Sequence, residues 1–170
     1  GSSWASVGKY GGAPIALATG LDGVGAIVST CGTSSSADDD LCIAVTRDGG
    51  QSFRQALILS VPDTDGYDTG GVVDPSTVHA SVAGSPLLSS GIAGEQAQPI
   101  YVTWRASDVS GGSRWFVTRV LVGVSGTIAE VALPQELTAI SNDREALFVR
   151  HRVAVFGTTI SPYLFFWQSS

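Results

Sequence analysis

Residues 46–53 read Thr46-Arg47-Asp48-Gly49-Gly50-Gln51-Ser52-Phe53, a polar and glycine-containing stretch between two apolar runs. A carboxylate such as that of Asp48 can accept hydrogen bonds from backbone N–H groups of its own turn. Glycine adopts positive φ angles at little cost, which suits Gly50, and Phe53 is placed to cover a hairpin. The stretch therefore predicts a tight turn between two antiparallel strands.

The runs on either side of this turn have the composition of β-strands. Leu41–Arg47 and Gln55–Ser60 are mostly apolar, and Gly, Asp and Pro lie near their ends. We interpret them as the third and fourth strands of one unit. Its first two strands are expected at Trp4–Gly8 and Gly25–Thr30.

The same order of strands recurs later in the chain. Two further copies begin with a similar pair of runs, His79–Gly84 with Pro99–Ser107 and His151–Gly157 with Pro162–Ser170. The second copy continues with Trp115–Leu121 and Thr127–Leu133, so it also has four strands. Self-similarity over tens of residues indicates a repeat architecture, and four antiparallel strands make one propeller blade.

We therefore predict an all-β chain of antiparallel four-stranded propeller blades. A single segment, residues 1–170, would hold approximate repeats at 4–78 and 79–150 and an incomplete repeat at 151–170. This makes about two and a half blades, whereas closed propellers typically have four or more. The chain could be a fragment, a second chain or a second copy could complete the ring, or the repeats could stack as an open sandwich.

Within this repeat, the turn stretch resembles the Asp-box of sialidases, the bacterial neuraminidase repeat. Every specified position of that pattern is occupied, by Thr46, Asp48, Gly50, Ser52 and Phe53. In that family the motif is structural, and here it falls between the expected third and fourth strands. The resemblance implies a sialidase-like propeller, a fold shared by sialidases, other glycoside hydrolases and non-catalytic receptor and adhesin domains.

The second copy departs from this pattern, because Gly123–Gly126 stands where its Asp-box would lie and no aspartate is present. The chain also lacks the N-terminal Phe- or Tyr-Arg-Ile-Pro segment of sialidases. The resemblance therefore favours an Asp-box module that binds a glycan or a protein and is non-catalytic by itself. The alternative is part of a sialidase-like glycoside hydrolase whose catalytic blades lie elsewhere.

Several side chains are candidates for binding or catalysis. A sugar-stacking site could use Trp104, Arg105 and Trp115, although aromatic residues more often form the core. Glycosidase chemistry needs two carboxylates, and the candidates are Asp74, Glu95, Asp108 and Glu145, although a solvated loop carboxylate is the favoured interpretation of each.

A calcium site is a further possibility in the acidic loop that contains Asp63, Asp65 and Asp68. Three carboxylates surround a glycine there, and Ca²⁺ prefers several oxygen ligands on a flexible loop. The loop lacks the terminal glutamate of an EF-hand. A solvated acidic loop is the alternative interpretation.

Charge and cysteine content restrict the partners of the chain and the compartment in which it is found. The net charge is −6, which excludes the phosphate-binding surface of a nucleic-acid binder, and no apolar run approaches the roughly 20 residues that span a membrane. Cys31 and Cys42 are the two cysteines, and the short polar loop between them favours a disulfide over two buried thiols. A disulfide would indicate a secreted or otherwise extracytoplasmic protein.

Overall fold

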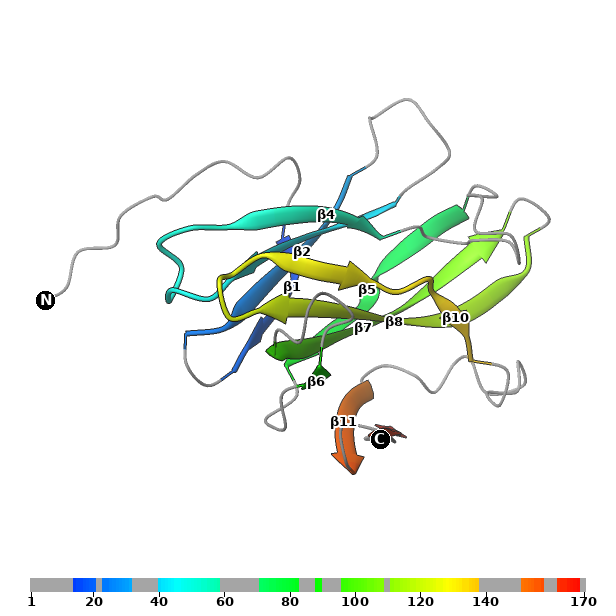
Figure 1. The fold of residues 1–170 in the computed structure, drawn as a ribbon. Coiled ribbons are helices and arrows are strands. Elements are labelled where there is room, and N and C mark those ends of the chain that lie inside the picture. Colours follow the sequence, from blue (N-terminus) through cyan, green and yellow to red (C-terminus); the bar gives the residue numbers. More distant parts are fainter. Residues whose placement is uncertain are drawn as a thin grey trace, which may run out of the picture.

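The structure is a computed structural model (Figure 1). It describes residues 14–20, 23–31, 40–58, 71–82, 88–89, 96–108, 111–137, 151–157 and 162–168. Every regular element among them is a β-strand, and every pairing is antiparallel, which confirms the prediction of an all-β antiparallel fold. None of these residues forms a helix able to cross a membrane.

The first sheet contains four strands in sequence order, each paired with the next. They are β1 (Pro14–Thr19), β2 (Gly25–Thr30), β3 (Leu41–Thr46) and β4 (Arg54–Ile58). The sequence analysis placed the first strand at Trp4–Gly8, which lies outside the described residues. The strand that pairs with β2 is β1, which the sequence analysis missed.

The second sheet repeats this meander with longer strands. Its main strands are β5 (Gly71–Val82), β7 (Gln96–Asp108), β8 (Ser113–Gly123) and β9 (Ile128–Val131). Short strands are added by β6 (Leu88–Ser89), which pairs with β7, and by β10 (Gln135–Glu136), which pairs with β8. Strand β5 begins at Gly71, so the expected repeat boundary at residue 79 falls inside it.

A third unit is represented by the hairpin of β11 (His151–Gly157) and β12 (Pro162–Gln168). Strand β11 contacts β5 of the second sheet. The two strands coincide with the runs expected to open the third repeat.

The first two sheets pack face to face around one apolar core. The core includes Val28, Ile43 and Val45 from the first sheet and Trp104 and Phe116 from the second. All five are at most 2% exposed, and the two aromatic rings stack with centroids 5.8 Å apart. Burial at roughly 25 cal/mol per Å² of apolar surface makes this contact the main source of stability.

Equivalent strands of the two sheets lie against each other. Strand β1 contacts β5, and β4 contacts β9, so first strand meets first strand and fourth meets fourth. A Cβ on Gly20, just after β1, would lie 2.5 Å from Cγ1 of Val82 at the end of β5, so the backbone approaches closely there. At the same end of the sheets, where β3 and β8 finish, Nη1 of Arg47 donates a 3.4 Å hydrogen bond to the carbonyl oxygen of Val122.

Both faces of the second sheet are buried. On β8, Phe116 and Val120 join the core shared with the first sheet, and neighbouring residues point to the other face because side chains alternate along a strand. That other face carries Tyr101, Val117 and Leu121, which are 4%, 7% and 2% exposed. The second sheet is therefore the interior layer of the described structure.

The predicted disulfide is present between Cys31 and Cys42, with Cα atoms 5.3 Å apart. The two residues lie at the facing ends of β2 and β3, where the N–H of Cys31 also donates a 2.9 Å hydrogen bond to the carbonyl oxygen of Asp40. The cross-link closes a short loop at the end of the hairpin. The prediction of a disulfide is confirmed.

Replacing both Cys31 and Cys42 with serine should lower the free energy of unfolding by about 3 kcal/mol, because the unfolded chain loses a closed loop. Urea denaturation of the oxidised protein and the variant measures this difference. Reduction of the wild type should give a similar loss, and reduction of the variant should change nothing. Equal stability of the oxidised wild type and the variant would contradict the assignment of a stabilising cross-link.

Candidate functional site

The turn between β3 and β4 is organised by the side chain of Asp48. Its Oδ1 accepts hydrogen bonds from the backbone N–H groups of Gln51 and Ser52 at 2.8 and 2.9 Å. Its Oδ2 accepts one from the Ser52 hydroxyl at 2.5 Å, and the Thr46 hydroxyl donates to Oδ1 at 2.8 Å. Thr46 Oγ1 in turn accepts from the N–H of Gly50 at 2.9 Å, so both side chains hold the turn closed.

Two glycines give this turn its shape. Gly49 and Gly50 have φ angles of 70° and 91°, which favour glycine over residues with a Cβ. The N–H of Gly49 donates a 3.1 Å hydrogen bond to the carbonyl oxygen of Gly23, in the turn between β1 and β2. The half-buried ring of Phe53 lies near Gly50, since a Cβ there would be 3.8 Å from Cζ. The carboxylate is thus committed to holding the turn, which fits a structural role.

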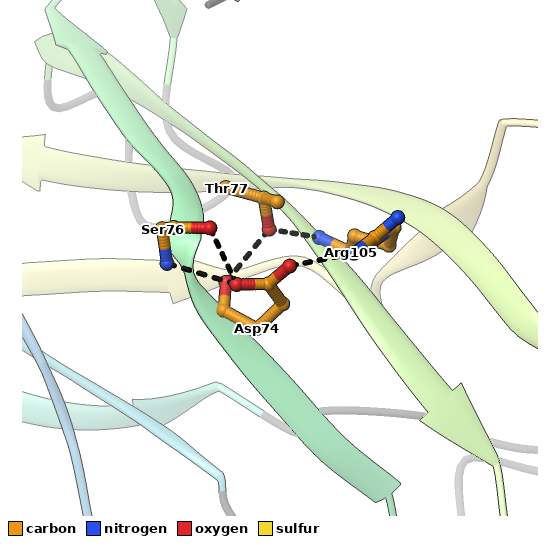
Figure 2. A network of polar contacts seen from close by, with 4 residues as sticks. All are labelled: Asp74, Ser76, Thr77 and Arg105. Atoms are coloured by element: carbon orange, nitrogen blue, oxygen red, sulfur yellow. Dashed lines mark hydrogen bonds and ion pairs between the residues drawn. The ribbon is translucent and has the colours of Figure 1, made fainter. Parts of the chain in front are cut away.

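The second polar cluster joins residues that are far apart in the sequence. Nη2 of Arg105, on β7, contacts Oδ2 of Asp74, on β5, at 2.7 Å (Figure 2). Oδ1 of the same carboxylate accepts hydrogen bonds from the N–H and the hydroxyl of Ser76 at 3.1 and 2.6 Å. The side chains of Arg105 and Asp74 are 28% and 32% exposed, so the pair is accessible to a ligand.

A bulge in β5 creates this cluster. Asp74 pairs with Arg105 and His79 pairs with Thr103, so Pro75–Val78 lie opposite the single residue Trp104. Proline has no N–H for a sheet ladder, and β5 is at the edge of the sheet, where such an interruption is tolerated. The bulge therefore displaces several residues from the regular ladder.

The buried Thr77 satisfies the backbone groups that the bulge leaves open. Its Oγ1 accepts a 2.9 Å hydrogen bond from the N–H of Arg105 and donates a 2.7 Å hydrogen bond to the carbonyl oxygen of Asp74 (Figure 2). These contacts fix the backbone on both sides of the ion pair. The guanidinium is accordingly held in one place before any ligand arrives.

Electrostatics keep Asp74 ionised. Partial burial alone raises the pKa of this carboxyl group, but the hydrogen bonds from Ser76 and the contact with Arg105 outweigh burial, so the pKa is lowered. Asp74 is therefore a poor proton donor at neutral pH. Among the described residues, Asp74 is the side-chain partner that the structure gives Arg105, through the single nitrogen Nη2.

The two tryptophans proposed for sugar stacking are both buried, Trp104 in the core between the two sheets and Trp115 on the other face of the second sheet. Trp104 is 0% exposed and stacks on Phe116, and Trp115 is 5% exposed. Neither ring face is available to a sugar in this structure. The expectation of a stacking platform at these two residues is corrected in favour of the core interpretation, whereas Arg105 remains accessible.

The other candidate carboxylates are distributed as follows. Asp63, Asp65 and Asp68, together with Glu95 and Glu145, lie outside the described residues, and for Asp108 the backbone alone is described. Among the described side chains, no group of three His, Cys, Asp or Glu residues is arranged to hold a metal ion. Glu130 and Glu136 form ion pairs with Arg119 and Arg114 at 2.7 and 3.1 Å.

Sequence reasoning named Asp74 and Arg105 separately but did not bring them together, and it missed Ser76 and Thr77. The contact between Asp74 and Ser76 does have a sequence signal. Asp-Pro-Ser-Thr is typical of a turn in which the aspartate accepts a hydrogen bond from the N–H of the residue two positions later. The pairing of β5 with β7 has no such local signal.

Comparison with models of known protein families, with curated proteins and with solved structures gave no match. The fold and the two polar clusters therefore carry the functional argument.

Replacing Asp48 with asparagine should destabilise the protein at neutral pH and have less effect in acid. Hydrogen bonds from Ser52, then from Thr46 and Gln51, hold the pKa of Asp48 far below its usual value of 3.8. Because the folded pKa is depressed, the ionised carboxylate stabilises the fold above pH 3.8, and this contribution falls as the pH drops toward the folded pKa.

Urea denaturation of the wild type and Asp48→Asn at pH 7, 5, 4 and about 3 tests this dependence. The stability difference between the two proteins should be greatest at pH 7 and should shrink below about pH 4. Ser125→Ala, in the corresponding turn of the second sheet, serves as the control and should show no such trend. A difference that stays constant down to about pH 3 would show that the charge of Asp48 is unimportant for the turn.

Proposed function

We propose that this chain is part of a sialidase-like Asp-box propeller that binds a glycan or a protein partner and is non-catalytic by itself. The observation that carries the binding part is Arg105, a partly exposed guanidinium fixed by Asp74 on a rigid sheet. Guanidinium groups bind carboxylates in a bidentate manner, so the ligand group we expect is an acidic one.

The propeller part rests on how the sheets stack. Two antiparallel four-strand meanders lie face to face, with β1 against β5 and β4 against β9. The contact of β11 with β5 continues the same order into the third unit. Successive blades around a propeller axis would have this relation, and the hydrogen bonds of Asp48 are those expected of an Asp-box turn.

A binding role is favoured over catalysis by the state of four carboxylates among the described residues. Asp48 and Asp74 are each held by several hydrogen bonds, and Glu130 and Glu136 are in ion pairs. A glycosidase needs one carboxyl group with a raised pKa as the acid, whereas the pKa values of Asp48 and Asp74 are lowered. These four groups are better suited to stabilising the fold and orienting Arg105.

The disulfide supports an extracytoplasmic setting. Disulfides persist in oxidising compartments and are rare in the cytosol. The bond between Cys31 and Cys42 is therefore consistent with a protein that meets its ligand outside the cytoplasm.

Binding of acidic oligosaccharides to Arg105→Ala tests the ligand site. Loss of the guanidinium should weaken retention of carboxylate-bearing glycans by about tenfold or more, with little change for neutral glycans. Arg105→Lys should restore the binding in part, because lysine keeps the charge but not the bidentate geometry. Affinity electrophoresis on a set of acidic and neutral glycans provides the measurement.

Arg119→Ala is the matched control, because Arg119 also lies on the second sheet and forms a 2.7 Å ion pair at similar exposure. It should bind glycans like the wild type. Equal loss of glycan retention in Arg105→Ala and Arg119→Ala would argue against the proposed site. So would a wild type that binds neither glycans nor acidic peptides. Release of a fluorogenic aglycone from a glycoside panel would instead support the hydrolase alternative.

A further inference from the structure

The outward face of the first sheet is apolar and partly exposed. Leu17 on β1 and Leu57 on β4 are 70% and 51% exposed, and the half-buried Ile27 lies on the same face. The pairing register places Leu17 beside Ile27, Ile27 beside Ala44, and Ala44 beside Gln55, in one row across all four strands. Exposed apolar sheet faces of this kind mark interaction surfaces.

Charge is absent from the described residues of this face. The row next to the first contains Ser29, Cys42 and Leu57, so the two rows together have no acidic or basic side chain. The whole chain, in contrast, has 24 charged residues, 9 basic and 15 acidic. A face without charge is typical of the central part of a protein interface.

The hollows of this face are continuous and shallow. One is lined by Ile27, Ser29, Gln55 and the disulfide, and the next by Leu17, Ile27, Phe53 and the backbone of several glycines near the turns. Ile27 borders both hollows. The surface can therefore accept side chains from a facing sheet at several points.

The repeat itself identifies the kind of surface that covers this face. Strand β1 lies against β5 and β4 against β9, and the C-terminal ends of β1 and β5 meet at Gly20 and Val82, so the two sheets stack with the same strand order and direction. Val45 points from the first sheet into the shared core, and Phe116 points into the same core from the second sheet. The free face is thus the counterpart of the face by which the second sheet packs on the first.

We infer that the free face of the first sheet is an interface for a second copy of this chain. The described sheets form a series from the first sheet through the second to the β11–β12 hairpin, so the free face is at one end and that hairpin at the other. A second copy would continue the series by placing its β11–β12 unit on this face. Such a head-to-tail contact closes into a ring or extends into a filament.

The size of the free face sets the expected strength of self-association. Four strands of five or six residues cover roughly 20 Å by roughly 19 Å, which is below the area of a standard stable interface. Self-association should therefore be reversible and depend on concentration. This inference rests on the stacking part of the proposed function and not on its ligand.

Sedimentation velocity over about a hundredfold range of concentration tests the inference. The wild type should shift from monomer to a larger species as concentration rises. Leu17→Asp should raise the dissociation constant by about a hundredfold or more, because association would bury an unpaired charge. Val124→Asp, at a side chain 55% exposed in the turn after β8, is the matched control and should associate like the wild type.

Leu57→Asp provides a second substitution on the same face, in case Leu17→Asp fails to fold as judged by circular dichroism. A wild type that stays monomeric throughout, or association that neither variant weakens, would overturn the inference. Glycan retention by monomeric Leu17→Asp separates the two proposals. Glycan retention by a wild type that stays monomeric would leave the ligand site standing and reject the interface, whereas a wild type that associates but retains no glycan would do the reverse.

Discussion

The apolar contact between the first and second sheets is the interaction on which the rest of the structure depends. Val28, Ile43, Val45, Trp104 and Phe116 meet there, and no single sheet could bury these side chains alone. An isolated antiparallel sheet leaves one face in water, so stability requires a second layer. The contact also explains why Trp104 is unavailable for ligands, because its side chain is fully buried between the two sheets.

Within the stacked sheets, some polar side chains only hold the fold together, and others remain accessible to a ligand. Asp48 has its carboxylate filled by hydrogen bonds within one turn, and that turn is linked to the turn at Gly23. Asp74, in contrast, supports another side chain, because the bulge of the edge strand β5 lets it hold Arg105 on the neighbouring strand β7. A fixed and partly exposed guanidinium loses little conformational entropy when a ligand binds, which favours a role in recognition.

Local chemistry made much of the fold predictable from the sequence. Apolar runs bounded by Gly, Asp and Pro marked most strands, and the polar turn at residues 46–53 and the short loop between the cysteines follow local rules. Strand β1 was missed because the repeat pattern placed the first strand at Trp4–Gly8, and because Pro14–Thr19 contains two alanines, which have low β-propensity. The Asp74 and Arg105 pair was not predictable either, because the two residues are 31 positions apart and meet through strand pairing and a bulge.

The stacking of equivalent strands is the central claim, and nuclear Overhauser effects measure it most directly. We expect a cross-peak between the α-protons of Gly20 and the methyl groups of Val82, where β1 meets β5. A second should join the β-protons of Arg47 to the α-protons of Gly126, in the β3–β4 and β8–β9 turns at the same end of the two sheets, since a Cβ on Gly126 would lie 3.7 Å from that of Arg47. Both cross-peaks would establish the face-to-face arrangement. Their absence in a well-folded protein with assigned resonances would contradict it.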